Sequence, residues 1–258
     1  MDLTIEGQRF LVCGASSGLG NATAHALLRE GASLLVTARR ADLLEKEFSL
    51  YGERVVAIAG DIREEKLLKK IACRALDEPL HGMMLNAGGP PVGTPLETKM
   101  EDWDRAWELV MRWKIELTLA IAPALAKRGY GRILYLESKT VKQPLPALVL
   151  SNAFRAGVTG FAKSLSREVG SRGVTVNVLA PGSHETPAIE RVIRKQSEQE
   201  GISAEEAKAK MEKAIPVGRM GRAEEFGQLA AWLLSPLSGY ITGQTISHDG
   251  GDVAGLFG

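Results

Sequence analysis

The sequence predicts a single α/β domain of the Rossmann type, a doubly wound parallel sheet with helices on both faces. Short runs of apolar, β-rich residues alternate with longer stretches of helical periodicity. The runs are apolar on both faces, which is typical of strands covered on two sides by crossover helices. The 258 residues suffice for one large domain, and no repeat or Gly/Ser-rich linker divides them.

The expected elements alternate along the whole chain. The expected strands are 9–14, 33–38, 54–60, 82–88, 132–138 and 174–182, with a last run at 244–251. A first helix is expected to end at residue 30, and further helices to cover 42–51, 64–76, 101–128, 147–170, 187–214 and 223–234. These boundaries follow from where the apolar pattern changes period.

The insertion at 187–214 differs in composition, because its segment 194–213 is strongly polar and its helix is therefore expected to be exposed. An insertion beyond the carboxyl end of a parallel strand often covers a ligand crevice. A solvated surface helix with no role is the alternative.

Composition and charge exclude several classes of function. The net charge of +1 is spread over mixed signs, which does not favour nucleic-acid binding or a polybasic membrane patch. We see no signal peptide and no apolar run long enough for a membrane span, so we expect a cytoplasmic protein. Cys13 and Cys73 lack metal-ligand or disulfide-scaffold spacing, so we expect buried free thiols and no metal.

The stretch CGASSGLG, residues 13–20, directly follows the first strand and opens a helix. Its glycines permit a tight turn and a close approach to a diphosphate, and the helix N-terminus offers N–H groups and partial positive charge. A tight turn with no ligand is the alternative, but the strand–loop–helix context favours cofactor binding. The loop residues expected to bind the cofactor are Gly14, Ser16, Ser17, Gly18, Leu19 and Gly20.

The spacing G-x-x-x-G-x-G resembles that of the short-chain dehydrogenase/reductase family, and the resemblance continues over nearly the whole chain. Asp61 resembles the family's adenine-contacting aspartate, and the segment IPVGRMGRAEEF and the DGG at 249–251 resemble its C-terminal landmarks. Asn86, Ala87 and Gly88 resemble its sheet-stabilising NAG segment, and Pro181, Gly182 and Thr186 resemble its nicotinamide loop. The resemblance implies a nicotinamide cofactor and a homo-oligomer, either a tetramer or a dimer.

The end of the second strand reads VTARR, with Arg39 and Arg40 where an acidic residue would favour NAD. No carboxylate is present there to repel a 2′-phosphate, and Arg39 can form a forked pair with one. We therefore expect NADP, with NAD as the alternative. The alternative is that both arginines are solvent-exposed charges at the start of a helix and bind no ligand.

The resemblance places the family's catalytic tetrad on four positions of this chain. In the family a serine ends the fifth strand, a Tyr-x-x-x-Lys pair follows thirteen residues later, and an asparagine lies on the preceding long helix. Here Ser138 matches the serine, but Ser151, Arg155 and Val110 stand at the tyrosine, lysine and asparagine positions. A serine hydroxyl is a poorer acid, whereas Arg155 keeps a positive charge that can hold the nicotinamide ribose.

Substitute proton donors are Ser138, Ser151 and His184, the last because histidine titrates near neutral pH. A loop histidine with no role is the alternative for His184. Lys114, one turn beyond Val110 on the same helix face, is a further candidate, but a surface lysine is the favoured interpretation. Glu137 is expected to point away from Ser138, as is Lys139, and Trp103, Trp107 and Trp113 are expected to serve packing or a subunit interface.

Three hypotheses of function remain open. The first is an NAD(P)(H)-dependent oxidoreductase that acts on a small carbonyl/alcohol pair through an atypical catalytic site. The second is a non-catalytic NADP(H)-binding sensor or a subunit that assembles with an active relative. The third is an isomerase or lyase built on the same scaffold. The apparent preservation of both the phosphate loop and the nicotinamide loop favours the first.

Overall fold

The computed structural model describes residues 1–86 and 88–256, which form a parallel sheet of seven strands. The strand order is β3-β2-β1-β4-β5-β6-β9, and it reverses direction between β1 and β4. This arrangement confirms the predicted doubly wound α/β fold. The strands are β1 (Arg9–Cys13), β2 (Ser33–Ala38), β3 (Val55–Ala59), β4 (Gly82–Leu85), β5 (Gly131–Leu136), β6 (Val174–Pro181) and β9 (Thr245–His248).

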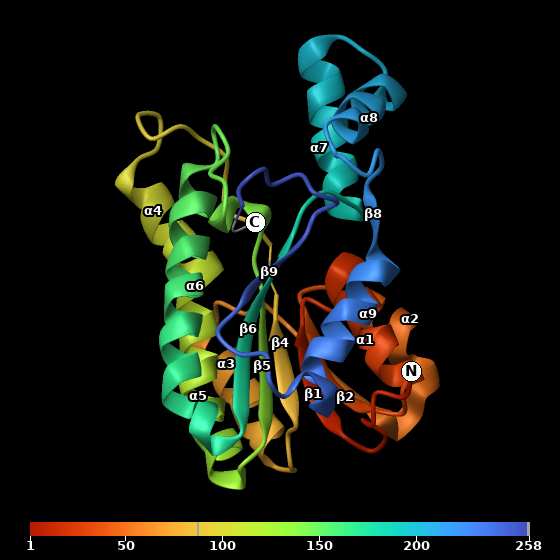
Figure 1. Ribbon diagram of the computed structural model, residues 1–258, viewed down its shortest axis with the longest axis vertical. Helices are drawn as coiled ribbons and strands as arrows, with labels where there is room; N and C mark the ends of the chain where they lie inside the picture. Colours follow the sequence, from red (N-terminus) through yellow and green to blue (C-terminus); the bar gives the residue numbers. More distant parts are fainter. Residues whose placement is uncertain (87, 257–258) are drawn as a thin grey trace.

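Two layers of helices cover the sheet (Figure 1). One layer contains α1 (Gly18–Arg29), α2 (Ala41–Phe48) and α9 (Ala223–Leu234). The other contains α3 (Glu65–Leu76), α4 (Met100–Ala106), α5 (Trp113–Arg128) and α6 (Val149–Val169). Short 3-10 helices cover Ser49–Arg54, Lys139–Val141, Gly170–Arg172 and Pro236–Ser238.

Each strand divides its side chains between the two layers, because successive residues of a strand point to opposite faces. In β5, Ile133 and Tyr135 join the apolar core under α3, α5 and α6. Leu134 and Leu136 join the core under α1, α2 and α9. The strands are therefore apolar on both faces, as the sequence pattern predicts.

The helix expected over 101–128 is wrong as a single element. A π-helical segment, Trp107–Arg112, separates α4 from α5. Such a segment changes the hydrogen-bonding register of the helix. The indole Nε1 of Trp113 donates to the Leu109 carbonyl at 2.9 Å, so that carbonyl has a partner. Apolar periodicity continues across the segment, which is why the sequence did not reveal it.

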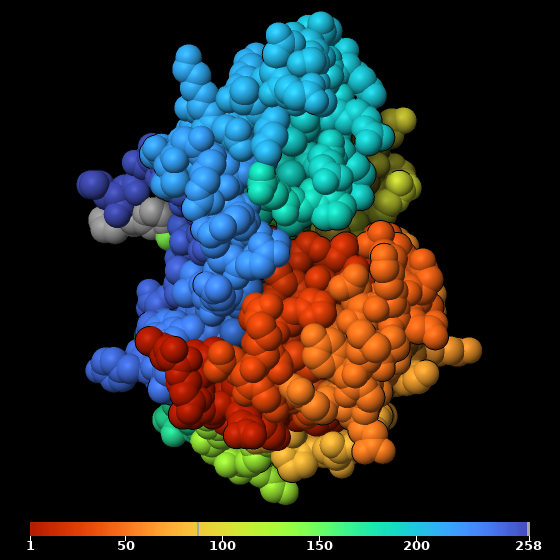
Figure 2. All heavy atoms as spheres, turned by 90° about the vertical axis from the view of Figure 1, so that its right-hand side faces the viewer, coloured from red at the N-terminus to blue at the C-terminus, as the bar shows by residue number. Residues whose placement is uncertain are grey.

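The helix expected over 187–214 is also two helices, α7 (Pro187–Glu200) and α8 (Ala204–Lys213). Gly201 ends α7 in the left-handed conformation, with φ of 66°, and Ser203 caps α8 by accepting a hydrogen bond from the Glu206 amide. Figure 2 shows the pair standing above the N-terminal half of the chain. The strands β7 (His184–Glu185) and β8 (Gly221–Arg222) pair at its base.

The two thiols differ in their environments. Cys13 is buried as expected, whereas Cys73 is exposed, so that part of the prediction is wrong. On α3 the buried face carries Ile71 and Ala75, and a residue midway between them turns outward. Among the described residues, no helix is long and apolar enough to cross a membrane.

The clustered tryptophans pack against the chain itself. Trp113 is buried in the core beneath the sheet. The rings of Trp103 and Trp107 both lie against Phe154 of α6, with centroid distances of 5.8 and 6.4 Å. These contacts join the segment before α5 to α6 and support the packing interpretation.

The Gly20→Ala substitution should destabilise the fold, because an added Cβ would overlap the Gly14 carbonyl oxygen. We expect the free energy of unfolding to fall by about 1–3 kcal/mol, measured by urea denaturation. The control is Gly160→Ala on α6, where a Cβ meets nothing within 4 Å. There alanine should raise stability by about 0.5–1 kcal/mol. A Gly20→Ala variant as stable as the wild type would contradict this account.

Candidate cofactor and active site

The phosphate loop is a narrow turn between β1 and α1. Gly14 and Gly18 have φ of 71° and 62°, a region that favours glycine. A Cβ at Gly14 would lie 2.7 Å from Nδ2 of Asn86, so Asn86 packs directly against the turn. A Cβ at Gly18 would lie 3.4 Å from the methyl group of Thr186. The predicted phosphate loop and nicotinamide loop therefore face each other at the carboxyl ends of the strands.

The turn provides the geometry that a dinucleotide diphosphate requires. It lies beside the reversal of strand order between β1 and β4, where ligands bind in open α/β sheets. The N-terminus of α1 presents unpaired backbone N–H groups at this point. Glycines at positions 14, 18 and 20 keep side chains out of the turn. The residues therefore fit the group that the sequence predicts.

The positive charge at the end of β2 is organised by Arg40. Its Nη2 donates to Ser17 Oγ at 2.8 Å and to Ser16 Oγ at 3.3 Å. Arg39 is also exposed, and its charge contributes to lowering the pKa of Asp61. The sequence predicts Arg39 as the 2′-phosphate ligand and predicts no separate role for Arg40. The contacts of Arg40 with both serines depend on packing between distant segments.

Asp61 lies where the family resemblance expects an adenine contact, but its carboxylate is paired. Arg63 donates to it through Nε at 3.0 and 3.1 Å and through Nη2 at 2.5 Å. The hydrogen bond from Arg63 is the main cause of the lowered pKa of Asp61. Ala87 lies outside the described residues, and Gly88 is exposed. Gly182, after Pro181, packs against Asp249, since an added Cβ would lie 2.8 Å from Cβ of that residue.

Ser151 and Arg155 lie one turn apart on α6 and contact each other. Arg155 Nε donates to Ser151 Oγ at 3.0 Å, and both residues are 8% exposed. Because a guanidinium has no acceptor, the serine oxygen must accept in this pair. The Ser151 hydroxyl proton is therefore available to another acceptor. Ser138 Oγ likewise accepts, from the Thr140 amide at 3.2 Å, so its proton is also available.

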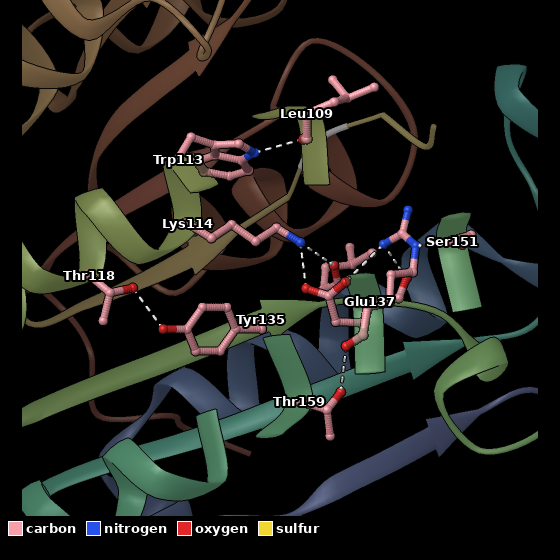
Figure 3. Close-up of polar contacts among 10 residues, drawn as sticks. Leu109, Trp113, Lys114, Thr118, Tyr135, Glu137, Ser151 and Thr159 are labelled. Carbon is pink, nitrogen blue, oxygen red and sulfur yellow. Dashed lines mark hydrogen bonds and ion pairs between the residues drawn. The ribbon is translucent and has the colours of Figure 1, made fainter. Parts of the chain in front are cut away.

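A buried carboxylate, Glu137, binds two cations from different helices (Figure 3). Arg155 Nη1 donates to Glu137 Oε2 at 3.0 Å and to the Glu137 carbonyl at 3.2 Å. Lys114 Nζ forms an ion pair with Glu137 Oε1 and donates to the Leu136 carbonyl at 3.4 Å. Val110, at the predicted asparagine position, is buried one turn before Lys114.

The surface position expected for Lys114 is wrong, because the residue is only 1% exposed. The sequence spacing placed Lys114 correctly on the helix but could not show that the carboxylate of Glu137 lies opposite it. An ionised Glu137 in this position requires a cation, since an unpaired buried charge is costly. Lys139 pairs instead with Asp252 near the C-terminus.

Burial shifts the pKa values of Lys114 and of two groups near this ion network, Cys13 and Tyr135. Burial lowers the pKa of Lys114, while the Glu137 carboxylate acts in the opposite direction and favours the ammonium form. Burial raises the pKa of the Cys13 thiol to about 12. Burial also raises the pKa of Tyr135, whose hydroxyl lies 2.7 Å from Thr118 Oγ1. Tyr135 is therefore a buried structural phenol.

His184 lies in the predicted nicotinamide loop, but both of its ring nitrogens have partners. Nδ1 lies 3.1 Å from the Gly182 carbonyl, and Nε2 lies 2.8 Å from Nδ1 of His248. A carbonyl only accepts, so Nδ1 carries the proton and Nε2 accepts from His248. Phe226 packs edge-on against both rings. The geometry favours a role for His184 in holding the loop at Gly182, and its role as an acid stays a prediction.

Comparison with known proteins identifies the family. A family model described as "Enoyl-(Acyl carrier protein) reductase" matches residues 14–252. The chain belongs to the short-chain dehydrogenase/reductase family. It is 32% identical over 250 residues to nodulation protein G of Rhizobium meliloti (strain 1021), covering 96% of this chain and 97% of that protein. It is also 32% identical over 253 residues to the 3-oxoacyl-[acyl-carrier-protein] reductase FabG of Escherichia coli (strain K12), covering 96% and 98%.

Solved structures of the same family have the same fold. The L-sorbose reductase of Gluconobacter frateurii, complexed with NADPH and L-sorbose, aligns with a TM-score of 0.93 at 26% identity. The alignment covers 99% of this chain and all of that one. A single-residue variant of actinorhodin polyketide ketoreductase, with NADPH, aligns with a TM-score of 0.89 at 28% identity, covering 95% and 97%. Both structures contain NADPH.

The histidine pair makes stability depend on pH. Burial lowers the pKa of His184 and of His248 from 6.5, so the unfolded chain binds protons that the native chain excludes. The stabilisation is therefore complete above pH 6.5 and is lost as the pH falls below it. We expect the thermal unfolding midpoint of the His184→Gln variant to decline less between pH 8 and pH 5. An unchanged decline would show that other groups cause the dependence.

Proposed function

We propose that the chain is an NADP(H)-dependent oxidoreductase that acts on a small carbonyl/alcohol pair through an atypical catalytic site. The observation that carries the proposal is the glycine turn at the N-terminus of α1, which faces Thr186 across the strand ends. Membership of a family that contains reductases supports it. The NADPH in the two structural neighbours supports the choice of dinucleotide.

Different residues would bind the different parts of the cofactor. The turn at Gly14 and Gly18 and the hydroxyls of Ser16 and Ser17 would hold the diphosphate. Arg39 and Arg40 would bind the 2′-phosphate, since both are exposed and the carboxylate of Asp61 is paired with Arg63. When bound, the nicotinamide supplies the hydride that the reaction transfers.

The proton side of the reaction depends on hydroxyl groups rather than a phenol. Ser138 and Ser151 both have hydroxyl protons available for a substrate oxygen, as derived above. The guanidinium of Arg155 beside Ser151 stabilises negative charge that develops on that oxygen. General acid catalysis contributes about 10²–10⁴-fold, whereas positioning reaches effective molarities of about 10⁵ M or more. A site without the phenol therefore keeps the larger contribution to the rate, which comes from positioning.

The second candidate is a non-catalytic NADP(H)-binding sensor or an assembly subunit. The serine and arginine at the predicted tyrosine and lysine positions favour it. It differs from the first candidate only in the absence of turnover once NADPH is bound. The homo-oligomeric state, the cytoplasmic location and the substrate-covering role of the 187–214 insertion stay predictions alongside it.

The double substitution Arg39→Ala/Arg40→Ala should weaken NADPH binding by about tenfold or more, because a charge-assisted pair to phosphate contributes about 1.5–3 kcal/mol. NADH affinity should fall less, because NADH lacks the 2′-phosphate and is affected only through the contacts of Arg40 with Ser16 and Ser17. Both affinities are measured by titration of nucleotide fluorescence. The control is Arg29→Ala, an exposed arginine at the far end of α1. Equal losses for NADPH and NADH would contradict recognition of the 2′-phosphate.

The Ser151→Ala substitution should lower kcat by about 10²–10⁴-fold without changing the Kd for NADPH, because it removes a proton donor. The assay is NADPH consumption against a panel of ketones and aldehydes. Ser164→Ala is the matched control on the same helix, where the exposed hydroxyl donates to the Gly160 carbonyl. An unchanged kcat would remove Ser151 from the proton path. A wild-type chain that binds NADPH but reduces no member of the panel would favour the sensor.

A further inference from the structure

With Lys114 in the ammonium form that its ion pair with Glu137 favours, the buried ion network holds more positive than negative charge. Lys114, Glu137 and Arg155 are 1%, 2% and 8% exposed, and two of the three are cations. Glu137 forms an ion pair with each cation, and no second carboxylate among the described residues forms an ion pair with either of them. A surplus charge in a buried place is unfavourable unless an anion joins it.

One nitrogen of the Arg155 guanidinium is left without a hydrogen-bond partner among the described residues. Nε is engaged with Ser151, and Nη1 with Glu137. Nη2 makes no hydrogen bond to any residue that the structure describes, and it lies 3.6 Å from the place of a Cβ on exposed Gly89. The unpaired Nη2 group therefore lies at the loop after β4.

Two donors stand side by side on α6. The Nη2 group belongs to the same guanidinium whose Nε lies 3.0 Å from Ser151 Oγ, and the serine proton is free to donate. Two adjacent donors, one of them cationic, suit two adjacent oxygens, one of them anionic. The carbonyl and carboxylate oxygens of a 2-oxo acid have this arrangement.

We propose that Arg155 and Ser151 form a subsite for a 2-oxo acid, with the carboxylate on Arg155 Nη2 and the reacting carbonyl oxygen on the Ser151 hydroxyl. The inference rests on the proposed oxidoreductase function and names its substrate class, a 2-oxo acid and the corresponding 2-hydroxy acid. Glu137 acts as a positioning residue, because it fixes the guanidinium through Nη1. Lys114 donates to Glu137 and to the Leu136 carbonyl, and it maintains the surplus charge.

The test compares an acid with its uncharged ester on the chain saturated with NADP⁺, which prevents reduction. Binding of 2-oxobutanoate and of methyl 2-oxobutanoate is measured by calorimetry. We expect the acid to bind about tenfold more tightly or better, the worth of one charge-assisted hydrogen bond. Arg155→Met should remove this preference. Lys127→Met, an exposed lysine at the far end of α5, should keep it.

Two further variants test the charge count without touching the ligand. Lys114→Met leaves one cation and one carboxylate, so the acid should lose about tenfold in affinity while the ester is unaffected. Lys114→Met/Glu137→Gln leaves Arg155 as the single charge and should restore the preference for the acid. A purely structural role would give two weakened variants with no such reversal. Thermal unfolding confirms that each variant is folded before titration.

The outcomes separate this inference from the proposed function. Equal binding of acid and ester, or no binding of the acid, overturns the subsite and leaves Arg155 to the cofactor ribose. Failure of NADP⁺ to bind overturns the proposed function. In that case the same ratio of acid to ester affinity, measured on the chain without cofactor, still decides the subsite. If the double variant restores the preference for the acid, the result supports the subsite, whether the chain is measured with NADP⁺ or without cofactor.

Discussion

The site depends on how closely the first strand and the first helix approach each other. Gly20 of α1 leaves no room for a Cβ against the Gly14 carbonyl, and Asn86 at the end of β4 packs on the same turn. This contact brings the N-terminus of α1 to the carboxyl edge of the sheet, where backbone N–H groups face the crevice. Parallel strands all end at this edge, so β5 and β6 deliver their own terminal residues beside it.

A second constraint is the carboxylate at the end of β5. Glu137 continues the side of the sheet that β5 buries beneath α5 and α6, and an ionised group there requires partners. One cation comes from each of these helices. Glu137 therefore links Lys114 to Arg155, and Arg155 in turn holds Ser151. Lys114 thus affects the conformation of two residues that are distant from it in sequence. Chemistry at the crevice and packing beneath the sheet are therefore not independent.

Local sequence pattern predicted the sheet and the glycine turn well, because each is determined by a short segment of the sequence. Strands buried on both faces are continuously apolar, and α9 was placed at its observed bounds. The failures lie where one residue decides a local break, as at Gly201, or where the partner is distant. Lys114 meets Glu137 across 23 positions, and His184 meets His248 across 64. No single segment carries the information that a buried carboxylate or a second imidazole lies opposite.

The two halves of the crevice differ in a way that has a physical reason. The cofactor half is made from backbone, so its glycines admit few alternatives. The proposed proton half is made from side chains on one face of α6, where charge and reach are the requirements. At the position where the family resemblance predicts a lysine, Arg155 keeps the positive charge, and its Nε donates to Ser151. In the proposed subsite, a substrate that carries its own negative charge would bind through the remaining donor, Nη2, and the Ser151 hydroxyl would hold its oxygen.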